Sequence, residues 1–162
     1  MISSSGAYRE IIRESNNQIK INMKKSILII MVAMIGVVTY GQENEEKSIK
    51  ELITNFAKAA DKSDAKELAT YLDENYRIVM NRLFGSESVS IINKTDYLAK
   101  IETKEWGGDK RTVEVHSIVI NGATASAHVT LKGEKATFIS IFTLIKNAEG
   151  EWRLVSDTPI VA

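Results

Sequence analysis

Residues 137–159, TFISIFTLIKNAEGEWRLVSDTP, contain two runs typical of β-strands around one short polar connection. Thr137 to Lys146 and Trp152 to Pro159 are rich in β-branched and aromatic side chains, which favour extended backbone. The Asn147-Ala148-Glu149-Gly150 segment between them has the composition of a tight turn. Because so short a connection joins only antiparallel neighbours, this stretch predicts a β-hairpin.

The same pattern continues upstream of the hairpin. Arg111 to Ile120 and Ala123 to Leu131 alternate apolar and polar side chains, and Asn121-Gly122 separates them. Lys132-Gly133-Glu134-Lys135 then connects them to the hairpin. A period of two is typical of strands, and both connections have the composition of hairpin turns. The C-terminal half is therefore predicted to be a four-stranded antiparallel meander.

The N-terminal half of the domain shows a helical period instead. Ser48, with Glu51 three residues later, matches a capping box, so the first helix is expected to begin there, after a charged tether over Gln42 to Lys47. Its apolar stripe recurs at three- and four-residue intervals and consists of Ile49, Leu52, Ile53, Phe56, Ala57 and Ala60. This stripe predicts an amphipathic helix with one face on the core.

Two shorter helices and one strand are expected next. Asp64 starts a second helix, and Thr95 to Ile101 form a third, capped by Asn93 or by Thr95 itself. Tyr76 to Met80 predicts a short strand between them. Helices followed by a meander predict an α+β fold in which helices cover one face of the sheet.

The run from Phe138 to Ile145 is apolar on both of its faces. A strand with one face in water would alternate with polar residues. The second face is therefore expected to meet a partner subunit or a ligand cavity, or to lie as a central strand under a long loop.

Four segments together resemble a known family. They are FAKAADKSD at 56–64, DYL at 96–98, NGATA at 121–125 and FTLIKNAEGEWRLV at 142–155. In this order they look like landmarks of the nuclear transport factor 2-like superfamily, over nearly all of residues 47–158. The branch that they resemble is the one labelled putative lumazine-binding, close to polyketide-cyclase-like and ketosteroid isomerase-like domains.

The resemblance implies a cone-shaped α+β domain of the cystatin-like class. In such a domain three N-terminal helices pack on a curved antiparallel sheet around a pocket, and the outer sheet face often forms a homodimer. Enzymes and non-enzymes share this fold, so the resemblance leaves the activity open.

Aromatic side chains are the first candidates for the lining of such a pocket. From their phase on the predicted helices and strands we select Phe56, Tyr76, Tyr97, Phe142 and Trp152 as ligand-binding residues. Buried aromatics also dominate ordinary cores, so Tyr97 has a competing interpretation as a core residue.

Candidates for catalysis are few. The isomerases of the resembled superfamily use a general-base Asp together with Tyr and Asp donors, and here Asp157 and His116 are the candidate catalytic groups. Asp157 precedes Thr158-Pro159, so it is also interpreted as a solvated or turn-forming residue. The sequence contains no phosphate-binding glycine loop, nucleophile elbow or zinc-helix motif.

His116 and His128 lie on neighbouring predicted strands, and their pairing depends on the turn between them. Asn121-Gly122 as a two-residue turn would put them on opposite faces. Matching the apolar faces requires a three-residue loop, which sets the histidines opposite each other with Glu114 and Thr130 alongside. We favour this register because it buries a whole face. No ligand-spacing motif orients the two histidines, and no metal site is predicted.

Residues 23–41, MKKSILIIMVAMIGVVTYG, have the pattern of a secretory signal peptide. Two lysines precede the apolar run Ile27 to Val38, which is shorter than the roughly twenty residues that a spanning helix needs. Thr39 and Gly41 put small residues at the −3 and −1 positions, so cleavage is expected before Gln42. The domain is therefore expected to be periplasmic or secreted, without stable membrane insertion after cleavage.

Residues 48–162 are expected to form one nuclear transport factor 2-like domain. Residues 1–22 show no core-forming pattern and are expected to be a mis-called or disordered leader, with Met23 as the true initiator. The alternative is a cytoplasmic leader that precedes a signal-anchor helix.

The amino-acid composition excludes several classes of protein. The chain has no cysteine, which excludes a lipoprotein anchor and a disulfide framework. From Gln42 onward, 16 Lys and Arg stand against 19 Asp and Glu, evenly scattered, so no basic surface for nucleic acid is predicted.

The sequence thus predicts an exported, non-catalytic domain that binds a small apolar or aromatic molecule in its cone, with no cofactor, as a homodimer through the sheet face. One alternative is a small isomerase, cyclase or dehydratase that uses Asp157 or a His as base with a Tyr donor. Another is a dimeric accessory module whose cone is filled by its own side chains. An acid or His with a perturbed pKa inside the pocket would favour the enzyme.

The expected cleavage can be tested at the N-terminus. When the protein is exported by its own signal, mass spectrometry of the mature chain should find Gln42 as its first residue, because cleavage follows the small residue at −1. A mature chain that retains residues 2–22 would contradict both the signal and the choice of initiator.

Overall fold

The computed structural model describes residues 13, 20 and 43–162, and residues 45–162 form one compact unit. The predicted leader and signal peptide lie outside the described residues, apart from Arg13 and Lys20. No helix in the described part of the chain is long and apolar enough to cross a membrane.

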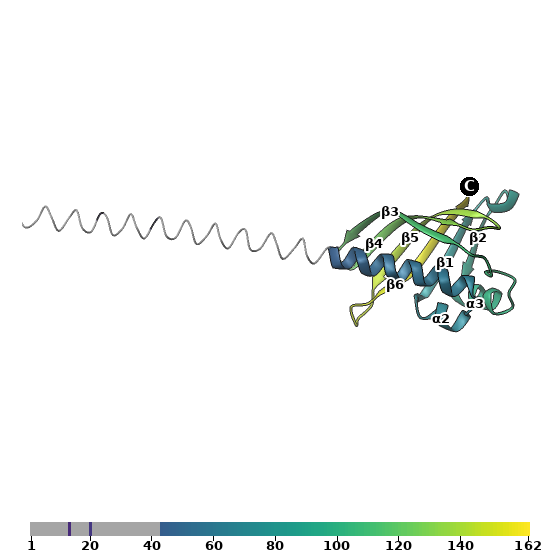
Figure 1. The fold of residues 1–162 in the computed structure, drawn as a ribbon, viewed down its shortest axis with the longest axis horizontal. Coiled ribbons are helices and arrows are strands. Elements are labelled where there is room, and N and C mark those ends of the chain that lie inside the picture. Colours follow the sequence, from purple (N-terminus) through teal and green to yellow (C-terminus); the bar gives the residue numbers. More distant parts are fainter. Residues whose placement is uncertain (1–12, 14–19, 21–42) are drawn as a thin grey trace, which may run out of the picture. The chain divides into compact units, whose positions relative to one another are not determined.

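Helices cover one face of a six-stranded sheet in this unit (Figure 1). A long helix over residues 43–61 precedes α2 (Ala65–Ala69) and α3 (Lys94–Glu102). The predicted apolar stripe of the long helix is buried, and Asp64 and Asn93 accept hydrogen bonds at the N-termini of α2 and α3. Caps and apolar stripes depend on residues only a few positions apart, so the positions of these helices could be predicted from the sequence.

The long helix begins earlier than predicted. Residues 43–47, expected to be a tether, are helical, so the helix starts before the capping-box pattern at Ser48. The Glu45 carboxylate accepts hydrogen bonds from Lys146 Nζ and Trp152 Nε1, both at 2.6 Å. These hydrogen bonds hold the pKa of Glu45 below its usual range, and the hydrogen bond from Lys146 has the largest effect. The first turns are therefore held on the sheet by contacts with residues that lie far along the chain.

The sheet has the strand order β2-β1-β6-β5-β4-β3 and remains open. Its strands are β1 (Leu72–Asn81), β2 (Val89–Asn93), β3 (Thr112–Asn121), β4 (Thr124–Lys132), β5 (Thr137–Lys146) and β6 (Trp152–Val161). Strands β3 to β6 form the predicted antiparallel meander. The sheet curves around the long helix, as Figure 1 shows, which confirms the predicted α+β cone.

The two strands outside the meander differ from expectation. β1 begins at Leu72 rather than at Tyr76, and it pairs with β6 in parallel. The register of this pairing is irregular between Leu72 and Arg77, a stretch that contains polar residues. β2 was not predicted, because it is a short edge strand with mostly exposed side chains and no clear alternation of burial. An edge strand carries little burial signal in its sequence.

The β3–β4 hairpin contains a bulge that the register analysis did not include. Glu114 pairs with Thr130, as in the favoured register, but on the turn side of the bulge Ser117, not His116, pairs with His128. The rings of His116 and His128 still lie 5.0 Å apart between centroids, on the exposed side of the sheet. The turn itself is the two-residue Gly122-Ala123, so both the Asn121-Gly122 turn and the favoured three-residue loop are wrong. The extra residue in the bulge is what keeps the apolar face buried on both sides of it.

The outer face of the sheet, away from the helices, carries exposed apolar side chains. Val119 is 64% exposed, Ile141 55% and Ile160 53%. The expectation that a long loop covers the second face of β5 is therefore wrong within the described residues.

One junction fixes the end of the long helix to the segment that leads into β3. Arg111 donates to the Asp61 carboxylate through its backbone N–H and through Nε, at 2.9 and 2.5 Å, and its Nη2 donates to the Ala57 carbonyl at 3.1 Å. Gly108 N–H donates to the Ala60 carbonyl at 3.3 Å. We call this set of contacts the helix-end junction.

A glycine substitution should test how closely the helix-end junction is packed. Gly107 has a φ of +83°, and a Cβ there would lie 2.3 Å from the Ala60 carbonyl oxygen, whereas Gly122 has a φ of +60° with nothing within 4 Å of a Cβ. Gly122→Ala should cost about 1 kcal/mol in left-handed strain, and Gly107→Ala about 1–3 kcal/mol more through overpacking. Urea denaturation measures both, and equal losses would contradict the close approach.

Candidate functional site

A cavity of about 350 Å³ lies between the helices and the inner face of the sheet. Its wall is mostly apolar and comes from every layer of the domain. The helices contribute Phe56, Ala60, Tyr97 and Ile101; β1 and the turn after it contribute Ile78, Met80, Leu83 and Phe84; the sheet contributes Leu131, Phe138, Ser140, Asp157 and Pro159. The remaining wall is the segment between α3 and β3, with part of the β4–β5 turn.

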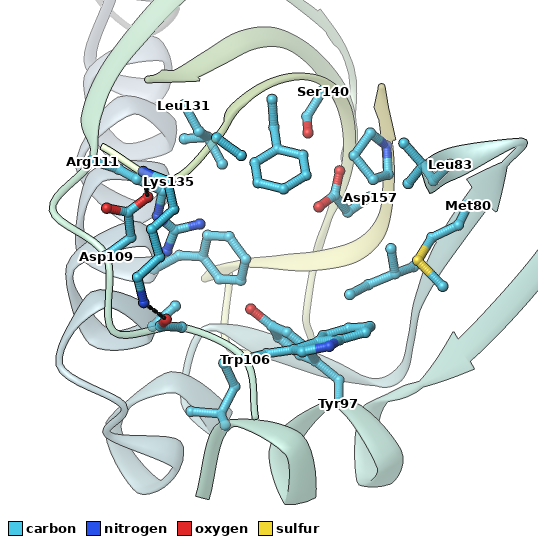
Figure 2. Close-up of a pocket in the computed structure, with 18 of the residues that line it drawn as sticks. Met80, Leu83, Tyr97, Trp106, Asp109, Arg111, Leu131, Lys135, Ser140 and Asp157 are labelled. Carbon is cyan, nitrogen blue, oxygen red and sulfur yellow. Dashed lines mark hydrogen bonds between the residues drawn. The ribbon is translucent and has the colours of Figure 1, made fainter. Parts of the chain in front are cut away.

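Aromatic rings form much of this wall. The ring of Tyr97 lies between those of Phe56 and Trp106, with centroid distances of 6.5 and 6.0 Å. Phe84 and Phe138 meet edge to face at 6.4 Å. Such rings offer flat apolar surfaces of large area. In Figure 2 the Tyr97 hydroxyl points into the cavity beside Trp106.

Ser140 and Asp157 form the polar part of the sheet wall. Ser140 is fully buried and Asp157 is 7% exposed. Within the described chain Ser140 Oγ and Asp157 Oδ1 make no hydrogen bond of good geometry, although the Ser140 hydroxyl lies close enough to the Asp157 carboxyl to lower its pKa. The only other buried side-chain atom without a partner in the described chain is the Tyr76 hydroxyl. Both atoms are closed off from solvent, and leaving such a group unpaired costs about 1–3 kcal/mol.

Burial sets the protonation of these groups. Desolvation raises the pKa of Asp157 to about 7, against the opposing effects of the Ser140 hydroxyl and the Arg111 guanidinium. The same cause raises the pKa of the Tyr97 hydroxyl, which therefore keeps its proton. Near neutral pH, Asp157 is thus present both as a carboxylic acid and as a carboxylate.

The end of the cavity opposite Asp157 carries the charged side chains of Asp109, Arg111 and Lys135 (Figure 2). Arg111 is held by Asp61 in the helix-end junction. The Asp109 carboxylate accepts hydrogen bonds from the backbone N–H groups of Glu134 and Lys135, which ties the β4–β5 turn to the segment before β3. This end is polar, yet its charges already have partners.

The structure brings three of the predicted site residues together. Phe56, Tyr97 and Asp157 line the cavity. Asp157 lies buried in strand β6, so its interpretation as a solvated or turn-forming residue is wrong. Tyr76 and Phe142 are buried behind the lining, with their rings 5.7 Å from Tyr97 and 5.6 Å from Phe56.

The other two predicted residues lie elsewhere. Trp152 is not part of the lining; its indole is bound by Glu45 on the long helix. His116 lies on the outer face of the sheet, where its Nε2 is 2.7 Å from Thr130 Oγ1. Within the described residues, no three His, Asp or Glu side chains are placed to hold a metal ion.

Trp106, Arg111 and Ser140 belong to the cavity wall but were not selected from the sequence. Ser140 carried a usable signal, since it is a polar residue at an inward position of an otherwise apolar strand. Trp106 and Arg111 come from an irregular segment whose side-chain directions no sequence period indicates.

The comparisons with known proteins agree with this architecture. The model of the putative lumazine-binding family matches residues 44–158. No curated protein matches the chain.

Several solved structures share the fold. A nuclear transport factor 2-like protein of unknown function from Silicibacter pomeroyi is 17% identical, with 75% of this chain and 98% of that chain covered and a TM-score of 0.65. A second such protein, from Shewanella baltica, is 18% identical, with 74% and 94% covered and a TM-score of 0.64. A ketosteroid isomerase-like protein from Erwinia carotovora atroseptica is 13% identical, with 71% and 94% covered and a TM-score of 0.56.

Identities this low show the fold alone. The family match, in contrast, spans most of the chain, including both helical and sheet layers. The chain therefore belongs to the putative lumazine-binding family, and its fold is that of the nuclear transport factor 2-like proteins.

Proposed function

We propose that this domain binds a small, largely apolar aromatic molecule in its cavity and does not transform it. The observation that carries the proposal is the wall of aromatic rings around a cavity of about 350 Å³. Small-molecule sites are typically concave, mostly apolar and equipped with a few polar groups that fix orientation. Tyr97 and Trp106 provide the flat surface, and Ser140 and Asp157 provide the polar groups.

The proposal includes export and self-association. The proposal of export is based on the signal-peptide pattern of residues 23–41. A homodimer through the outer sheet face is supported by the exposure of Val119, Ile141 and Ile160 on that face, because a partner would remove their apolar surface from water. Equilibrium sedimentation of the exported protein tests this part of the proposal: a concentration-independent monomer would contradict it.

The second candidate is an enzyme that moves a proton. Asp157, with its pKa near neutrality, and the Tyr97 hydroxyl share one cavity, an arrangement suited to a general base and a hydrogen-bond donor. The two candidates differ in what leaves the cavity. A binding protein releases its ligand unchanged, whereas the enzyme releases an isomer or a dehydrated product, and Asp157→Asn would abolish that conversion.

The two tryptophans give a direct test of the binding site. Quinoline, a neutral aromatic probe, should shift the indole N–H resonance of Trp106 in two-dimensional NMR and leave that of Trp152 in place, because only Trp106 lines the cavity. Trp106→Leu should weaken quinoline binding about tenfold through loss of ring packing, and Trp152→Phe is the matched control with unchanged affinity. A shift confined to Trp152, or equal losses in both variants, would contradict the proposed site.

Asp157 should leave a signature in the pH dependence of stability. Its pKa is raised in the folded state, so its stabilising contribution is complete below the unfolded value of 3.8 and is lost as the pH rises through about 7. Relative to Asp157→Asn, the wild-type protein should therefore lose up to about 4 kcal/mol between pH 4 and pH 8. Urea denaturation of both proteins at several pH values measures this difference. A difference that stays constant with pH would show that Asp157 titrates normally.

A further inference from the structure

One edge of the sheet is an exposed strand that lacks the usual protection against pairing with another chain. β2 lies at this edge and has only β1 beside it (Figure 1). Its residues, Val89–Asn93, include no charged side chain and no proline, and their pairing with β1 has no irregular register. Val89 is 58% exposed and Ile91 63%. Charged side chains, prolines and bulges are the features that normally keep an edge strand from pairing, so the β2 edge is open to a further strand.

The opposite edge of the sheet, β3, carries two of these protections. Glu114 places a charge on the strand, and a bulge follows Val115. A bulge disrupts the row of backbone groups and increases the local twist. Of the two edges, β2 is therefore the one that presents a regular and uncharged row of backbone N–H and C=O groups.

The geometry of this edge specifies the conformation of its partner. A row of edge N–H and C=O groups is satisfied by an extended segment that adds one strand to the sheet. Ile92 pairs with Ile78, which lines the cavity, so Ile92 lies on the inner face. Val89 and Ile91 lie on the outer face, because side chains alternate along a strand. A matching strand is therefore uncharged and has apolar side chains at alternate positions.

The β2 strand of a second copy has these properties. Antiparallel pairing about Ser90 sets Val89 of each copy opposite Ile91 of the other. Four exposed apolar side chains then meet on the outer face, and the two Ser90 side chains face each other at the two-fold axis. No like charges oppose each other within the paired strands. A two-fold contact of this kind uses the same patch on both copies, so it closes on itself.

We infer that β2 is a self-association surface, through which two copies pair their β2 strands antiparallel about Ser90 and form one continuous sheet. This contact differs from the sheet-face homodimer proposed above, because it uses the backbone groups of the edge. Val119 and Ile141, on the outer face, take no part in it.

Cysteine cross-linking of the exported protein tests the pairing, since the chain has no cysteine of its own. Ser90→Cys should form a disulfide-linked dimer under mild oxidation, because directly opposed side chains of antiparallel strands lie close enough for this bond. Ser90 pairs with Met80, which lines the cavity, so Ser90 lies on the inner side of the sheet. A dimer through the outer faces would keep the two Ser90 side chains apart. Asn55→Cys, exposed on the long helix, is the matched control and should not cross-link.

Two further variants check the register. A mixture of Val89→Cys and Ile91→Cys proteins should form the mixed disulfide, because these positions oppose each other, and should form it faster than either protein links to itself. Ile141→Lys, on the outer face, should leave the Ser90→Cys cross-link in place.

A Ser90→Cys protein that cross-links no faster than Asn55→Cys would overturn this inference, and it would leave the proposed ligand cavity and the sheet-face homodimer standing. Loss of the Ser90→Cys cross-link on Ile141→Lys would also overturn it, because the contact would then depend on the outer face.

Discussion

The ion pair between Asp61 and Arg111 joins two parts of the chain that are 50 residues apart, and the cavity depends on it. Both side chains are mostly buried, with 15% and 12% of their surface exposed, and the Arg111 backbone N–H and Nη2 bond to the same end of the long helix. Breaking a buried pair leaves an uncompensated charge, which costs about 3–5 kcal/mol. The pair therefore holds the helix, the segment before β3 and one end of the cavity wall in a fixed arrangement.

This arrangement explains how a small domain keeps an open space in its interior. The buried rings of Tyr76 and Phe142 pack against Tyr97 and Phe56, respectively, on the side away from the cavity, and so support its wall. Ser140 Oγ and Asp157 Oδ1 make no hydrogen bond of good geometry in that wall. Interiors normally pair such atoms, so two poorly paired buried atoms beside a cavity distinguish this part of the wall from an ordinary core.

Much of the fold could be predicted from local sequence signals. The meander followed from alternation and turn composition, and α2 and α3 followed from caps that act within three residues. The start of the long helix could not be predicted, because its first turns depend on the contacts of Glu45 with β5 and β6. The bulge at His116 escaped the register analysis because a single inserted residue leaves alternation intact on either side.

The site was predictable only in part, for a related reason. Phe56 and Tyr97 lie on regular helices whose phase indicates the inner face, and they do line the cavity. Trp106 and Arg111 lie on an irregular segment placed by the helix-end junction, so no periodicity points to them. Trp152 points to the inner face of the sheet, as predicted, but it is the first residue of β6 and lies away from the cavity. Alternation along a strand indicates which face a side chain is on, but not how far along the strand the cavity lies.

Native mass spectrometry of the gently purified, exported protein tests the central claim most directly, because it asks whether the cavity is occupied by a small molecule. If a ligand occupies the cavity, the folded chain will carry a reproducible extra mass that is lost on denaturation. A bare chain in every preparation, with a crystal structure in which the protein's own side chains fill the cavity, would contradict it.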